Sequence, residues 1–186
     1  MNTTAPDFEV PGIDPFEHEI TQYRLSDAVD NGKAVFLFMY PFDFSPVCTG
    51  ELCGLSDAQW YQFTENVEVW GISKESVYAH DQFADEYDLT IPLLSDSHAD
   101  IAKEYGVCHD ELENHKNIPQ RSVFVINRNQ EIEYKWTTEN PYEIPNFSPI
   151  QEAIERLCTN VLGEDGVPDV EIDYEKGVSD FSSHRN

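Results

Sequence analysis

The chain has 186 residues and a formal net charge of −25, from 36 acidic residues against 11 Lys and Arg. This length suits one domain with a full core, and the acidic balance argues against a nucleic-acid partner, since a cationic surface for phosphates is missing. No stretch approaches the roughly 20 apolar residues of a membrane span, the N-terminus lacks signal-peptide features, and four cysteines are too few for a disulfide scaffold. We therefore expect a cytoplasmic protein that is not membrane-bound.

The first half of the chain alternates strand and helix patterns. Strands are predicted over residues 7–11 and 19–25, a turn or short helix over 27–33, a buried strand over 34–40, a helix from about 46 to about 65, and a strand over 67–72. The seven residues 34–40 are mostly apolar, which indicates a buried strand in the centre of a sheet.

The second half continues the alternation and ends with a hairpin and a helix. We predict a helix over 75–87, an extended piece over 91–96, a helix starting near Ser97, a polar loop over 108–120, a strand over 122–126 paired with 131–136, and a helix from Ser148 to about 162. The pattern predicts an α/β fold with a central mixed sheet flanked by helices. Residues 1–163 form the predicted domain, and 164–186 are predicted to be an acidic, mobile tail.

Cys48 occupies the most informative position in the chain. It falls in the first turn of the helix that follows the buried strand, where free N–H groups and the helix dipole stabilise a thiolate. Ser45, three residues earlier, could cap this helix or present its hydroxyl beside the sulfur. Pro41 and Pro46 restrict the intervening loop. These residues together predict a nucleophilic thiol at the end of a central strand.

The pattern Pro41-x-x-x-Ser45-x-x-Cys48, with Glu51 three residues later, resembles the active-site signature of the peroxiredoxins. Further similar stretches are Gly71-Ile72-Ser73, Pro92-Leu93-Leu94-Ser95-Asp96 and Pro119-Gln120-Arg121-Ser122-Val123-Phe124-Val125-Ile126. The resemblance is to the Q-type, or bacterioferritin-comigratory-protein, branch in particular. It implies a thioredoxin-like fold and a thiol-dependent peroxidase, an antioxidant enzyme of cell redox homeostasis that needs no cofactor or metal.

The resemblance also implies roles for individual residues. Cys48 is similar to the peroxidatic cysteine, whose thiolate attacks a peroxide oxygen and becomes a sulfenic acid. Ser45 matches the residue whose hydroxyl binds the sulfur and the peroxide, and Pro41 matches the one that shields the site from water. Arg121 matches the arginine beside the sulfur, where its permanent charge favours the thiolate. Glu51 matches the acidic residue that positions this arginine.

Cys53 lies five residues after Cys48, the spacing at which the Q-type branch places its resolving cysteine. On an intact helix, residues five apart have Cα atoms roughly 8 to 9 Å apart, whereas a disulfide needs less than about 7 Å. A Cys48–Cys53 disulfide therefore requires the helix to unwind, which Gly50 and Gly54 would ease. Cys53 could instead be a packed core residue, and Cys108 is a second candidate for the resolving thiol.

Two other functions fit parts of the pattern. Cys48 and Cys53 could be the dithiol of a thioredoxin-type thiol–disulfide oxidoreductase, although that chemistry normally uses Cys-x-x-Cys. The protein could also be a non-enzymatic sensor that relays oxidation from Cys48 to a partner. For the peroxidase, the expected partners are hydrogen peroxide or organic hydroperoxides and a thioredoxin-like protein or small thiol as reductant, with the chain acting as a monomer or homodimer.

The acidic residues are spread along the whole sequence. A solvated acidic surface, kept in solution by self-repulsion, is one explanation of the charge. Adaptation to molar salt is the other, because counterions then screen the repulsion within a few ångströms. We favour the second and expect a halophilic protein.

Overall fold

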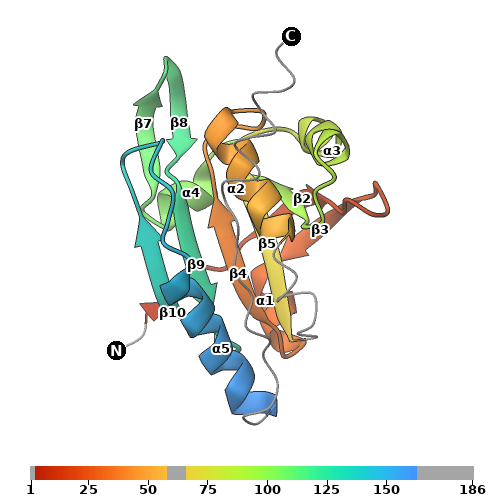
Figure 1. Cartoon of the computed structure of the whole chain (residues 1–186), viewed down its shortest axis with the longest axis vertical. Helices are drawn as coiled ribbons and strands as arrows, with labels where there is room; N and C mark the ends of the chain where they lie inside the picture. Colours follow the sequence, from red (N-terminus) through yellow and green to blue (C-terminus); the bar gives the residue numbers. More distant parts are fainter. Residues whose placement is uncertain (1–2, 58–65, 163–186) are drawn as a thin grey trace.

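The computed structural model describes residues 3–57 and 66–162 (Figure 1). In this part of the chain the strands are β1 Thr3–Thr4, β2 Glu9–Ile13, β3 Ile20–Arg24, β4 Ala34–Met39, β5 Val67–Ser73, β6 Leu93–Ser95, β7 Cys108–Leu112, β8 His115–Pro119, β9 Ser122–Ile126 and β10 Glu131–Thr137. The helices are α1 Leu25–Asp30, α2 Pro46–Asp57, α3 Val77–Glu86, α4 Asp100–Glu104 and α5 Ser148–Leu162. Among the described helices, none is both long and apolar enough to cross a membrane.

The larger sheet has the strand order β1-β10-β9-β4-β5-β6-β2-β3. Strand β4 lies near its middle, parallel to β5 and antiparallel to β9. All six residues of β4 are buried, which explains its unbroken apolar sequence, since both faces of the strand meet the core. The predicted mixed sheet, and the predicted hairpin between 122–126 and 131–136, are confirmed.

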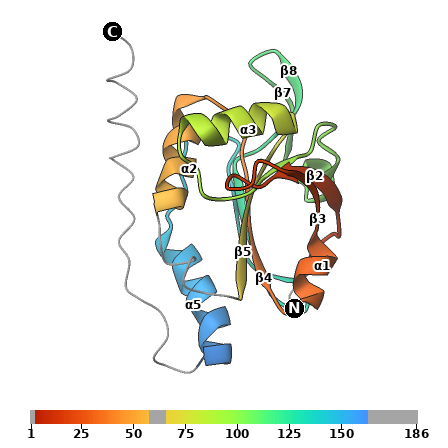
Figure 2. The same ribbon diagram turned by 90° about the vertical axis from the view of Figure 1, so that its right-hand side faces the viewer.

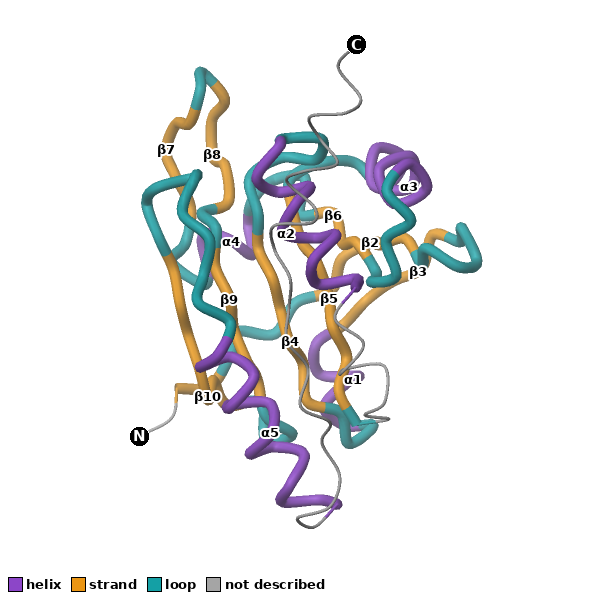
Figure 3. The backbone as a smooth tube through the Cα atoms, viewed as in Figure 1, coloured by secondary structure: helices purple, strands orange, loops and turns teal. Residues whose placement is uncertain are grey.

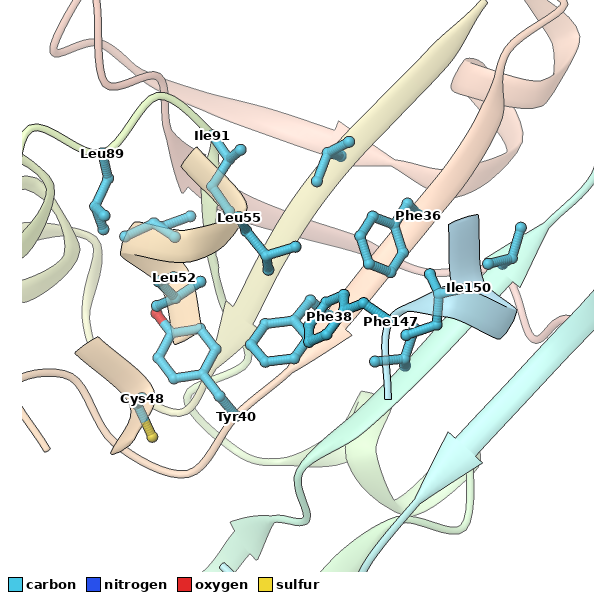
Figure 4. Packing of buried hydrophobic residues seen from close by; sticks show 14 of the residues in the cluster. Phe36, Phe38, Tyr40, Cys48, Leu52, Leu55, Leu89, Ile91, Phe147 and Ile150 are labelled. Carbon is cyan, nitrogen blue, oxygen red and sulfur yellow. The ribbon is translucent and has the colours of Figure 1, made fainter. Parts of the chain in front are cut away.

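Helices cover both faces of the sheet, with α2 and α5 on one side and α1 on the other (Figure 2). Successive residues of β4 point to opposite faces. Phe36, Phe38 and Tyr40 belong to the core under α2, α3 and α5, where Figure 4 shows the two phenylalanine rings beside Ile150 and Phe147. Val35 and Leu37 belong to the second core, under α1 and α4.

One predicted loop is wrong. Residues 108–120 form an antiparallel hairpin, β7 with β8, which stands at the same end of the molecule as the start of α2 (Figure 3). The short strand β1, which pairs with β10, was not predicted either. The predicted end of the Cys48 helix near residue 65 and the predicted tail at 164–186 lie outside the described residues.

Candidate active site

Cys48 is the third residue of α2 and follows a short loop from the carboxyl end of β4. Its side chain is only 1% exposed and belongs to the same core as Tyr40 and Leu52 (Figure 4). The backbone N–H of Cys48 donates to the Ser45 hydroxyl over 3.4 Å. Ser45 therefore accepts a hydrogen bond from the first turn of the helix, as a capping residue does. Pro41 is buried at the start of this loop.

Arg121 lies directly beside the sulfur. Strand β9 runs antiparallel to β4 with Ser122 opposite Met39, so the residue before β9 reaches the edge where the loop to α2 begins. The Nη2 group of Arg121 lies 3.3 Å from the Sγ of Cys48 and donates to the Pro141 carbonyl over 2.9 Å. This places a permanent positive charge next to the thiol.

Glu51 holds the other side of the guanidinium. Its Oε2 accepts from Nη1 of Arg121 in an ion pair whose side chains are 0% and 1% exposed, respectively. A buried ion pair restricts the position of both groups, and loss of either partner would leave an uncompensated charge. Glu51 is one turn after Cys48 on α2, so the helix itself sets the spacing between the sulfur and the carboxylate.

The two other described thiols differ in position. Cys53 is also on α2 and is half-buried against the core that contains Cys48. Because both cysteines lie within one intact helix, they are about 8 to 9 Å apart at Cα by helix geometry. Cys108 begins β7, and burial raises the pKa of its thiol. The predicted roles of Cys53 and Cys108 stay predictions.

A buried polar group beside Cys48 was not predicted. The Tyr40 hydroxyl donates to Oδ1 of Asp43 over 2.8 Å, and Oδ2 of Asp43 lies 2.8 Å from Nδ1 of His80. Burial, and then the charge of the Asp43 carboxylate, raises the pKa of the Tyr40 phenol well above its usual value, so the phenol keeps its proton. His80 lies three residues before Phe83 on α3, which is the spacing of one helix face and could have indicated an inward-facing histidine.

The β7–β8 hairpin contacts both loops that border the site. The ring of His115 meets the ring of Phe42 edge to face, with centroids 5.2 Å apart. The Tyr142 hydroxyl donates to Oε1 of Glu113 over 2.9 Å. Phe42 follows Pro41, and Tyr142 follows the Pro141 that accepts from Arg121. The hairpin therefore supports the segments on either side of the thiol.

Comparisons with known proteins identify the family of the chain. The family model of the AhpC/TSA family matches residues 1–135. The chain is 40% identical over 109 residues to a Coxiella burnetii protein named "Putative peroxiredoxin bcp", covering 56% of this chain and 71% of that protein. It is 32% identical to the chloroplastic peroxiredoxin Q of Triticum aestivum, over 58% of this chain and 48% of that protein, so it spans about half the length of that relative.

Solved structures give the same result. Peroxidoxin BcpB of Mycobacterium tuberculosis has a TM-score of 0.66 at 28% identity, with 84% of this chain and 94% of that chain covered. AhpC of Enterococcus faecalis has a TM-score of 0.70 at 25% identity, with 90% and 98% covered. The expected thioredoxin-like α/β fold is confirmed. The chain belongs to the AhpC/TSA family, as a peroxiredoxin similar to the bcp and Q proteins, and is thus a thiol-dependent peroxidase.

Proposed function

We propose that Cys48 is the peroxidatic cysteine of this enzyme. Its thiolate sulfur attacks one oxygen of the peroxide, the O–O bond breaks, and the other oxygen leaves as an alkoxide or hydroxide that takes up a proton. Cys48 then carries a sulfenic acid. The observation that carries this assignment is the 3.3 Å approach of Arg121 Nη2 to the sulfur, because a guanidinium at that position stabilises the thiolate and can bind the departing oxygen.

The surrounding residues have supporting roles in the proposal. Glu51 and the Pro141 carbonyl hold the guanidinium from two directions. Ser45 orders the first turn of α2 through the Cys48 N–H and offers its hydroxyl to the peroxide. Pro41, buried at the start of the loop, excludes water from the sulfur. The substrates proposed are hydrogen peroxide and organic hydroperoxides.

Cys53 is proposed to resolve the sulfenic acid. Its thiol attacks the Cys48 sulfur, the sulfenic oxygen leaves as water, and an intramolecular disulfide forms. Since a disulfide needs Cα atoms closer than about 7 Å, residues 48–53 of α2 must leave the helical conformation in this step. A thioredoxin-like dithiol in the cytoplasm then returns two electrons and two protons and restores both thiols.

Peptide mass spectrometry after one molar equivalent of hydrogen peroxide tests both assignments. The proposal predicts loss of two hydrogens and a Cys48–Cys53 linkage. Cys48→Ser should abolish peroxide consumption, whereas Cys53→Ser should leave a sulfenic acid on Cys48 that a small thiol can still reduce. Undiminished turnover by Cys48→Ser would overturn the peroxidatic assignment. A linkage to Cys108, with Cys53 still a thiol, would overturn the resolving assignment alone.

A further inference from the structure

Three buried side chains join the active-site loop to α3. Tyr40 immediately follows β4, Asp43 lies in the loop between β4 and α2, and His80 is on α3. His80 is 0% exposed, and its Nε2 lies 3.1 Å from the Leu94 carbonyl of β6. We call this group, held by the 2.8 Å contacts of Asp43 to Tyr40 and to His80, the Tyr40–Asp43–His80 clasp.

The hydrogen-bond partners of the clasp fix how many protons it holds. The phenol proton of Tyr40 goes to Oδ1 of Asp43, and a proton on Nε2 of His80 goes to the Leu94 carbonyl, which can only accept. One further proton must lie between Nδ1 of His80 and Oδ2 of Asp43, because two facing lone pairs at 2.8 Å would repel. Each polar side-chain atom of the three residues thus has a hydrogen-bond partner in this buried position.

The residue next to Asp43 is held by the same helix. Phe44 has a φ of 57°, in the left-handed region that a side chain of this size rarely adopts. Its ring packs edge to face on Phe83 with centroids 4.9 Å apart. Phe83 is one turn after His80 on α3, and both are buried. One face of α3 therefore holds Asp43 by a hydrogen bond and Phe44 by an aromatic contact, immediately before Ser45.

We infer that the Tyr40–Asp43–His80 clasp positions Cys48. It holds the loop and the first turn of α2 in the arrangement seen here, with α2 helical and Cys48 beside Arg121, which we call the closed arrangement; in the open one, α2 is unwound. This inference rests on the proposed two-cysteine cycle. Its three side chains do not contact peroxide; they act through the loop that carries Ser45 and leads into α2. In this role the clasp favours attack on peroxide, which needs the closed arrangement, and opposes the unwinding that brings Cys48 to Cys53.

This role predicts opposite effects on two steps. In Tyr40→Phe, which keeps the ring and removes its hydrogen bond to Asp43, and in His80→Gln, attack on peroxide should slow by about tenfold, as for loss of a hydrogen bond to a charged group. Disulfide formation should become faster by about threefold or more, because the open population increases. If the clasp only stabilised the fold, the variants would have a lower melting temperature, but they would not slow attack on peroxide while accelerating disulfide formation.

The test follows both steps in single turnovers of the reduced protein with hydrogen peroxide, by tryptophan fluorescence and by mass spectrometry of quenched samples. Val29→Ala is the matched control, since it removes buried volume in the second core under α1. It should lower the melting temperature and leave the ratio of the two rates unchanged. The double variant Tyr40→Phe/His80→Gln should match the more affected single variant, because the clasp acts as one unit.

Hydrogen exchange of the reduced protein supplies a readout that does not depend on the redox cycle. Amides of residues 44–55 should exchange faster in both clasp variants than in Val29→Ala at equal stability. Unchanged exchange there, or two rates that fall together as in a globally destabilised protein, would overturn the inference. Absence of a sulfenic acid on Cys48 in the unaltered protein would instead overturn the proposed function, and the exchange result would still decide the role of the clasp.

Discussion

The Nη2 group of Arg121 lies 3.3 Å from the sulfur of Cys48, while Nη1 of the same guanidinium binds the buried carboxylate of Glu51. One cation therefore serves two anionic groups of α2, one of which is present at all times and one of which forms when the thiol ionises. The carboxylate keeps the arginine buried and in place when the sulfur is protonated. The arginine's effect on reactivity and its effect on stability can thus be separated by substitution.

Arg121→Met should lower the rate constant for oxidation by hydrogen peroxide by about 10²- to 10³-fold, because the group that stabilises the thiolate and the leaving oxygen is lost. It should also destabilise the fold by about 3 to 5 kcal/mol, since Glu51 is left buried without its partner. The double variant Arg121→Met/Glu51→Gln should recover most of this stability but none of the rate. Stopped-flow oxidation and urea unfolding measure the two effects, and recovery of the rate in the double variant would contradict the role of Arg121.

Cys53→Ser should keep the oxidation rate of the parent protein and lose turnover with a thioredoxin-like reductant. The serine hydroxyl cannot form the disulfide that such a reductant attacks. Peroxide consumption coupled to a thioredoxin system, compared with consumption supported by excess dithiothreitol, measures the difference. Equal turnover of parent and variant in the thioredoxin system would show that another thiol resolves Cys48.

Cys108 should react slowly with alkylating reagents. Burial is the largest cause that raises the pKa of this thiol above 9.0, and only the thiolate is nucleophilic. At pH 8 its alkylation should therefore be slower than that of a cysteine in a short peptide, and the ratio should approach one only as the pH rises through the raised pKa. Iodoacetamide labelling of Cys108 from pH 7 to 10, followed by peptide mass spectrometry, checks this. Cys108→Ser should leave peroxide turnover unchanged, and a loss would indicate a redox role.

The net charge of −25 should make stability depend on salt. Repulsion between exposed carboxylates is screened over about 10 Å at 0.1 M salt and about 3 Å at 1 M. We therefore expect the melting temperature to rise steadily from low to molar KCl. Sucrose, which stabilises proteins by exclusion without screening charges, is the control and should have a smaller effect. A flat response to KCl would show that the acidity is only a solvated surface.

The sequence predicts those elements whose side chains face a core. The strand over 34–40 and the helix from Ser148 to 162 were placed within a residue of their bounds. The strand is a continuous apolar run because both of its faces are buried, and the helix starts at a recognisable capping box. The hairpin of β7 and β8 was missed because most of its residues are exposed or half-buried, so its sequence shows no alternation. Its strands are held mainly by backbone pairing, which leaves little trace in side-chain type.

The residues of the site were likewise predicted only in part. Cys48, Ser45 and Glu51 are close in sequence, so their proximity at the start of the helix could be anticipated. Only the resemblance connected them to Arg121, 73 residues from Cys48. His80 was missed for a physical reason. A polar residue on a helix is normally assigned to the solvent side, and its burial depends on Asp43, a partner 37 residues away whose carboxylate faces inward.

Glu51 lies between Cys48 and Cys53 on the same helix, and its only described ion-pair partner is Arg121. In a Cys48–Cys53 cycle, the turn of α2 that unwinds carries this carboxylate, so forming the disulfide would separate a buried ion pair. A disulfide normally makes a protein harder to unfold. In that cycle the cross-link would close only a very short loop while the oxidised form would lose an internal charge pair. We therefore expect the oxidised enzyme to be the less heat-resistant of the two redox forms.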